Sequence, residues 1–164
     1  MRAPFLALTF LAAAFASSAA AQQAPLTTQF MDEKTIMGLI DKAKAERKGE
    51  APLVAEPIVL LAPYKAQLEY RAGTAPAALH EKDAELFVVI QGTGKIVTGG
   101  KLVDEKRVNA ANLTGTSIEG GDAHDVVHGD VLVVPPNTPH QVIPGGAPIV
   151  VMTMHVPLPA ANWP

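Results

Sequence analysis

Two segments of the chain carry the residue types that could bind a metal or move a proton. In the first, His80 is followed by Glu85 and, after six further residues, by Gly92; in the second, Gly129 precedes His140. Imidazole and carboxylate groups suit first-row divalent metals, and three such ligands leave positions for water and substrate. Taken singly, each side chain favours a structural role. The sequence has no cysteine, which excludes a thiolate zinc site and a cysteine nucleophile.

Together the two segments resemble the two sequence motifs of the cupin superfamily, and the resemblance extends over residues 58–156. Aligned on Glu85 and Gly92, His80 takes the place of the second histidine of the first motif, and His140 that of the histidine in the second. In that family the motifs are hairpins on opposite sides of a small β-barrel, and their side chains meet on one metal ion. The resemblance implies that one divalent transition metal (iron, manganese, nickel or zinc) is held by His80, Glu85 and His140.

The chain departs from the family pattern at the first histidine of the first motif, where it has Ala78. Lys82 offers no replacement while it is charged, because an ammonium group has no lone pair to give to a metal. Since one family ligand is missing, we expect a lower metal affinity than the full set would give.

The other three histidines have less specific surroundings. His124 and His128 are four residues apart and lie just before a Gly-Asp turn signal, where a strand or loop is expected and not a helix that would pair them on a metal. Both are predicted to be exposed. His155 lies near the end of an apolar strand and could point into the barrel or away from it. A hydrogen-bonded structural role is favoured for it, with a fourth metal ligand as the alternative.

Three polar residues share one face of a predicted strand, namely Gln67, Glu69 and Arg71. Directed into a barrel, they would orient a substrate, and Arg71 would suit a carboxylate. Directed outward, they would be ordinary solvated side chains. The outward orientation is the favoured one.

The elements that must position these residues are mostly short β-strands. From residue 53 onward, short β-branched and apolar runs alternate with Pro and Gly turn signals. We predict strands over residues 58–62, 66–71, 85–91, 94–98, 131–134, 141–143 and 149–156. Many short strands with one helix predict an all-β fold. The resemblance specifies it as a cupin barrel, a double-stranded β-helix or jelly-roll, with residues 101–128 as an insertion between the motifs.

The strand that carries Glu85 has apolar residues on both faces. The face of Glu85 would line the barrel, while the face formed by Leu86, Val88 and Ile90 needs a cover outside it. Three segments could provide this cover: a predicted helix, residues 53–61, or a partner subunit.

One amphipathic helix is predicted over residues 32–48. Asp32 is placed to cap it, Gly49 to end it, and apolar residues recur at helical spacing between them. A single helix with so narrow an apolar stripe is marginal in water, so it must pack on the barrel or on a neighbouring subunit.

The first residues have the features of a signal peptide. Arg2 precedes an apolar stretch over residues 4–16, and small residues precede Gln22. An uncleaved membrane anchor is the less favoured alternative. We predict three parts: a signal peptide over residues 1–21, an arm and helix over 22–52, and a barrel over 53–164. The protein is therefore expected to be exported, either periplasmic or secreted.

The charge distribution limits the partners. The formal net charge is −3, and the basic residues are scattered, so there is no footprint for nucleic acid or an anionic membrane. The expected partners are a small-molecule ligand or substrate and a second copy of the chain, because two-fold homodimers are the commonest assembly.

Two functions fit these expectations. The first is an exported metal-binding cupin that acts as an oxygenase or lyase on a small organic substrate. The alternative is a non-catalytic cupin of the periplasm that binds or senses a small molecule. Ala78 at a ligand position favours the alternative. So does the lack of a recognisable acid–base pair, since Glu81 and Asp83 are more plausible as surface residues. The sequence identifies no catalytic residue.

Overall fold

The computed structural model describes residues 28–158, and the predicted signal peptide with its cleavage site before Gln22 lies outside the described residues. Within this range the chain forms one helix and thirteen strands. In chain order they are α1 (Glu33–Glu46), β1 (Leu53–Leu61), β2 (Tyr64–Arg71), β3 (Ala77–His80), β4 (Asp83–Gln91), β5 (Thr93–Thr98), β6 (Lys101–Val103), β7 (Lys106–Arg107), β8 (Asn112–Gly115), β9 (Ser117–Glu119), β10 (Asp122–Val127), β11 (Val131–Val134), β12 (His140–Pro144) and β13 (Ile149–Pro157).

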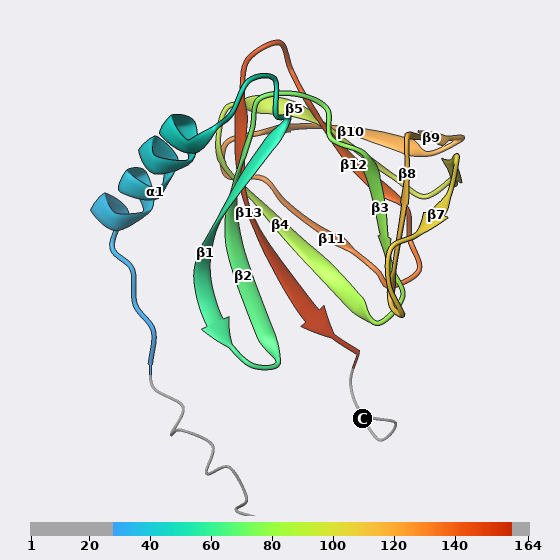
Figure 1. The fold of residues 1–164 in the computed structure, drawn as a ribbon, viewed down its shortest axis with the longest axis horizontal. Helices are drawn as coiled ribbons and strands as arrows, with labels where there is room; N and C mark the ends of the chain where they lie inside the picture. The colour runs from blue at the N-terminus through green and yellow to red at the C-terminus, as the bar shows by residue number, and fades with distance from the viewer. Residues whose placement is uncertain (1–27, 159–164) are drawn as a thin grey trace, which may run out of the picture.

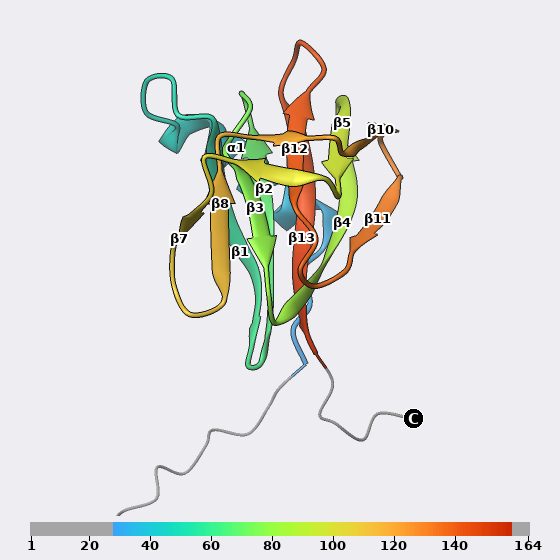
Figure 2. The same ribbon diagram turned by 90° about the vertical axis from the view of Figure 1, so that its right-hand side faces the viewer.

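The strands form two large antiparallel sheets that face each other (Figures 1 and 2). The five-stranded sheet has the order β1-β2-β13-β4-β11, and the six-stranded sheet has the order β10-β5-β12-β3-β8-β7. A small pair, β6 with β9, lies beside them. Non-consecutive neighbours such as β13 and β4 mean that the chain crosses between the sheets, as in a jelly-roll. The prediction of an all-β barrel with one N-terminal helix is confirmed.

The main core lies between the two sheets. Phe87 and Val89 of β4 and Val151 of β13 meet Ile96 of β5 and Val142 of β12, and all five side chains are buried. The alternation along β4 explains this arrangement, because every second residue points to the same face of a strand. Glu85 lies on the same inward face, at the end of β4 that carries the polar residues described below.

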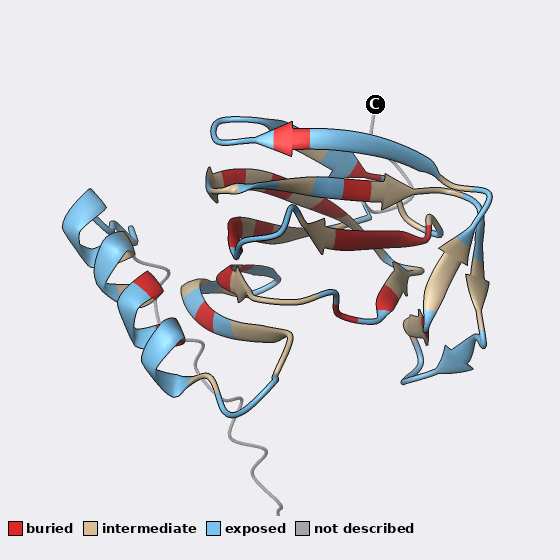
Figure 3. Ribbon diagram, turned by 90° about the horizontal axis from the view of Figure 1, so that it is seen from above, coloured by how far each residue is buried: buried red, intermediate tan, exposed pale blue. Residues whose placement is uncertain are grey.

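Helix α1 lies on the outer face of the five-stranded sheet (Figure 3). It is capped by Asp32, whose carboxylate accepts a hydrogen bond from the Thr35 backbone N–H at 2.8 Å. Ile40 is fully buried and packs against Leu68 and Val150. The helix therefore covers part of the outer sheet face, which confirms that it packs on the barrel. Among the described residues, no helix is long and apolar enough to cross a membrane.

Two parts of the predicted strand pattern are wrong. Residues 101–128, for which no strand was predicted, contain β6 to β10, and β8 and β10 pair with strands of the six-stranded sheet. These strands are short and mostly polar, so they give no signal of apolar periodicity and are held by pairing with their neighbours. Strand β3 was also missed, because its four residues are too few to show a period. Strand β1 also begins at Leu53 and not at residue 58. Pro57 suggested a break in the strand, but β1 lies at the edge of its sheet and its pairing with β2 shifts register after Pro57, so the strand continues through this proline.

Candidate functional site

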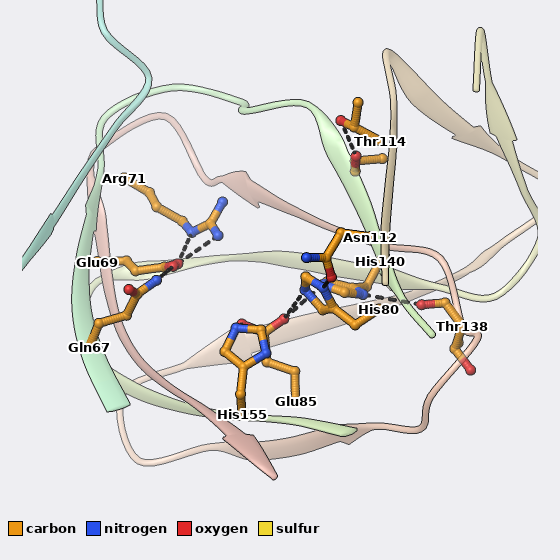
Figure 4. Close-up of polar contacts among 11 residues, drawn as sticks. Gln67, Glu69, Arg71, His80, Glu85, Asn112, Thr114, Thr138, His140 and His155 are labelled. Carbon is orange, nitrogen blue, oxygen red and sulfur yellow. Dashed lines mark hydrogen bonds and ion pairs between the residues drawn. The ribbon is translucent and has the colours of Figure 1, made fainter. Parts of the chain in front are cut away.

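Four titratable side chains from both sheets meet at one end of the barrel (Figure 4). His80 ends β3 and His140 begins β12 in the six-stranded sheet, while Glu85 lies on β4 and His155 on β13 in the five-stranded sheet. Glu85 and His155 are cross-strand partners. The fold thus brings together the three residues that the motifs single out, His80, Glu85 and His140, and adds a fourth.

The three imidazoles point their Nε2 atoms at the Glu85 carboxylate. The Nε2 atoms of His140 and His80 lie 2.8 and 3.2 Å from Glu85 Oε2, and Nε2 of His155 lies 3.8 Å from Oε1. The donor atoms of His80, Glu85 and His155 all lie within 4.8 Å of one another; His140, a predicted ligand, is not in this group, although its Nε2 atom is the one nearest to Glu85. Such a convergence of nitrogen and carboxylate donors is what a mononuclear divalent site needs.

The Nδ1 atoms of two of these imidazoles are held by oxygen acceptors. Nδ1 of His80 is 2.7 Å from the side-chain oxygen of Asn112, and Nδ1 of His140 is 3.1 Å from the backbone oxygen of Thr138. An oxygen acceptor keeps a proton on Nδ1, so a bound cation would take the place of the Nε2 proton that these rings donate to Glu85 in its absence. Asn112 lies in a segment predicted to be an insertion, and no sequence signal assigned it to the site.

Burial and hydrogen bonding compete over the protonation of the carboxylate. Burial alone would raise the pKa of Glu85, but hydrogen bonds from His140 and His80 outweigh it and hold the pKa well below the usual range. Burial would lower the pKa of His80, but its contacts with Glu85 and Asn112 raise it on balance. For His155, burial dominates and lowers the pKa. Glu85 is therefore a carboxylate, and His155 is held towards its neutral form.

His155 is directed at Glu85 and not away from the barrel. Its ring centroid is 4.7 Å from that of His80, and within residues 28–158 it makes no hydrogen bond. The favoured expectation, a hydrogen-bonded structural histidine, is thus not met among these residues. The alternation along β13 could have found it, because Val151 is buried in the barrel core on the same face of the strand.

The four side chains line a cavity of about 270 Å³. Gln67, Glu69 and Arg71 of β2 line the same cavity, so the prediction that they face outward is wrong. The opposite face of β2 carries Leu68, which docks against α1, and this leaves the polar face for the lumen. A polar strand face usually faces solvent, so the sequence of β2 alone favours the outward orientation. The docking of α1 on the opposite face of β2 turns the polar face into the barrel, and the sequence of β2 does not show this docking.

The β2 residues form a hydrogen-bonded network. Arg71 Nε donates to one Glu69 oxygen at 2.8 Å, and Gln67 Nε2 donates to the other at 2.7 Å. The side chains of Glu69 and Arg71 are only 5% and 11% exposed, so their ion pair is shielded from solvent. Both charges are therefore paired inside the barrel.

His124 and His128 stay outside the site, as predicted. Both are exposed; His124 Nε2 lies 3.3 Å from the Thr98 hydroxyl, and His128 Nδ1 lies 2.7 Å from the Ile90 carbonyl oxygen. Within the described chain, neither contacts the four converging side chains. They serve as matched controls for the site histidines.

Solved structures identify the fold. The chain is similar to TT1209 from Thermus thermophilus, with a TM-score of 0.54, 13% identity, and coverage of 80% of this chain and all (100%) of that one. It is also similar to a protein with a double-stranded β-helix domain from Klebsiella pneumoniae, with a TM-score of 0.52, 13% identity, and coverage of 72% and 86%. An RmlC-like cupin from Shewanella frigidimarina aligns with a TM-score of 0.47 and 12% identity over 68% and 79%.

No protein-family model matches the chain, and no curated protein matches it. The likeness to solved structures shows that the chain has the double-stranded β-helix fold, as the cupin motifs predicted. At this low identity, the fold is all that the likeness conveys. What the chain binds must be argued from its own side chains.

Proposed function

We propose that the protein is a metal-binding cupin whose cavity holds one divalent first-row transition metal through four side chains: His80, Glu85, His140 and His155. The observation that carries this proposal is the convergence of three Nε2 atoms on the carboxylate of Glu85. Asn112 and Thr138 contact Nδ1 of His80 and His140 and so orient the Nε2 atoms of these two rings towards the carboxylate. Histidine ligands of metal sites are commonly oriented by hydrogen bonds of this kind. When bound, such an ion supplies Lewis acidity at an open coordination position.

His155 fits the proposal because it compensates for Ala78. Ala78 lines the cavity on β3 opposite His140, where the family pattern has an imidazole. His155 brings an imidazole to the same cavity from β13. The proposed ligands, three imidazoles and one carboxylate, are as many as the cupin motifs supply. One imidazole, that of His155, comes from a different strand than in the motifs.

The site offers little acid–base machinery beyond the ligands. Glu81, one residue from His80, is engaged by Arg107 at 2.8 and 2.9 Å. Glu69 accepts hydrogen bonds on both oxygens. An oxygenase or lyase reaction would therefore depend on the metal and its bound substrate. The second candidate, a binding or sensing protein that turns nothing over, is favoured by this same lack of a free general base.

Metal analysis of the purified protein tests the proposal. We expect close to one equivalent of a single transition metal after purification, or after reconstitution followed by desalting. Clearly substoichiometric metal, with no gain on reconstitution, would contradict the metal site and leave a metal-free binding protein. Turnover measured on the metal-loaded protein then separates enzyme from binder.

Export belongs to the same proposal, and the apolar leader supports it. We expect the mature protein to begin at Gln22 and to be found in the periplasm or the medium. Intact mass spectrometry of the exported form measures this start directly. A retained leader, or a start many residues away from Gln22, would contradict the assignment.

A further inference from the structure

We propose that the ligand of this cavity is a small organic carboxylate, and that Arg71 binds its carboxylate group while the metal takes a second donor atom of the same molecule. This inference rests on the proposed metal site and adds the chemical class of the ligand. It is carried by the polar network of β2, which the metal site does not use.

Arg71 has donors to spare. Within residues 28–158, the contacts of its guanidinium all go to one oxygen of Glu69, from Nε at 2.8 Å and from Nη2 at 2.6 Å. A guanidinium has further N–H groups in the same plane, which match the two oxygens of a carboxylate. Arg71 lines the cavity, and no buried donor of its side chain is left unpaired, so its free N–H groups border open space.

Glu69 and Gln67 hold Arg71 in place. Glu69 is buried, and its second oxygen accepts a hydrogen bond from Gln67. The carboxylate is therefore fixed on both sides, and it fixes the planar group of Arg71 in turn. Because an arginine side chain is otherwise flexible, this support lowers the entropy lost when a ligand binds.

The charge balance of the cavity favours an anion. The charges of Glu69 and Arg71 cancel, and imidazoles that ligate a metal are neutral, so they add none. A divalent ion on the single carboxylate of Glu85 leaves one uncompensated positive charge in a largely buried space. An uncompensated buried charge is costly, and a ligand with one negative charge removes that cost.

The size and walls of the cavity limit the rest of the ligand. A cavity of about 270 Å³ is smaller than the usual site for a drug-sized molecule. Leu53, Ala75, Pro76 and Val142 supply apolar wall around the polar groups. The ligand is therefore a short acid with little polar surface apart from its carboxylate and its metal-binding group.

Calorimetric titration of the zinc-loaded protein tests the inference. The probes are hydroxy acids of increasing length, namely glycolate, 3-hydroxypropanoate and 4-hydroxybutanoate, each paired with its neutral amide. We expect at least one acid to bind the wild type more tightly than its amide. In Arg71→Gln, the affinity for that acid should fall about tenfold or more, as for loss of a charged hydrogen-bonding partner. Lys101→Gln, the same change of charge at an exposed position on β6, should bind the acid as the wild type does.

Two further variants cover the risk that Arg71→Gln fails to fold with Glu69 left unpaired. Arg71→Lys keeps the charge without the planar fork and should weaken acid binding less. Glu69→Gln combined with Arg71→Gln removes both charges of the pair and should lose the acid preference.

Zinc content, measured on the same samples, separates the two proposals. If the wild type takes up no zinc, the metal site is wrong and the present inference falls with it. If zinc is bound but the Arg71 variants bind the acids as tightly as the wild type, the carboxylate lies on the metal alone and the role of Arg71 is wrong. The same conclusion follows if the zinc-loaded wild type does not prefer any acid to its amide.

Discussion

Ala78 stands where the cupin motif has its first histidine, and His155 offers an imidazole from the facing sheet. Both positions line the same cavity, so the imidazole that β3 lacks relative to the cupin motif is supplied by β13. A mononuclear site requires donors at suitable distances from one point and does not require a particular order along the chain. The candidate set of metal ligands can therefore be complete although the linear motif is not.

Removing a central ligand should strongly weaken metal binding. His140→Ala and Glu85→Gln each delete a donor at the point where the side chains meet. A ligand that binds only the folded state stabilises it by about 2.7 kcal/mol at a hundredfold excess over Kd. Added metal should thus raise the Tm of the wild type and of the control His124→Ala clearly more than that of the other two variants. Loss of the response in His124→Ala with its retention in His140→Ala would show that the motif register is wrong.

The position of the third imidazole can be tested by exchange. His155→Ala should weaken metal binding about tenfold or more, since even residues outside the ligand shell affect affinity on that scale. Ala78→His in the same variant should restore affinity, because Ala78 borders the same cavity. Competition with a metal-sensitive dye measures both constants. If His155→Ala binds as the wild type does, His155 is not a ligand.

The site residues differ in how far the sequence predicts them. His80, Glu85 and His140 could be selected because the spacing of two motifs agrees. Metal binding by them stays a prediction. Arg71 was assigned to the wrong face, because the alternation of β2 is equally consistent with either orientation until the docking of α1 fixes it. Asn112 had no signal at all, since its role depends on the pairing of β8 with β3.

Among the elements, predictability follows apolar alternation. Strands β4 and β13 have strong patterns and were predicted within one or two residues of each end. Strand β10 has only one buried residue, Val126, and is held by its pairing with β5. A strand of this kind is stabilised by its neighbours, so its own residues do not reveal it.

Helix α1 should contribute to the stability of the whole barrel. Ile40 is fully buried between the helix and the five-stranded sheet, and its replacement by Ala removes apolar contacts and leaves a cavity. We expect Ile40→Ala to lower the free energy of unfolding by about 2–5 kcal/mol. Urea denaturation measures this change. Met37→Ala, on the same helix but 45% exposed, should cost far less, and equal losses would mean that α1 is not docked as described.

At the scale of the whole molecule, part of the outer sheet face remains uncovered. Strand β11 forms the edge of the five-stranded sheet, and its Val131 and Val133 are 63% and 59% exposed beside Val88 and Leu86 of β4. Helix α1 covers a different part of the same outer face, around Leu68 and Val150. Exposed apolar patches of this kind often mark an interface. The homodimer remains a prediction, and this face is where we expect it.

A charge on this face should dissociate the dimer. Val133→Lys introduces a charge at a position that is exposed in the monomer, so the fold should tolerate it. Sedimentation at tens of micromolar should give a dimer for the wild type and a monomer for the variant. Val108→Lys, equally exposed (62%) but next to β7 at an edge of the six-stranded sheet, should remain dimeric. A monomeric wild type would contradict the prediction.

The ligands of the candidate metal site are divided equally between the two sheets. His80 and His140 belong to one sheet, and Glu85 and His155 to the other. An ion bound by all four would add a cross-link between two layers that are joined at this end by the connections from β3 to β4 and from β11 to β12. Its release should increase local opening at the mouth of the barrel while the apolar core stays closed. Amide hydrogen exchange would then report metal occupancy as a local change, faster in β3 and at the start of β12 and unaltered around Ile96.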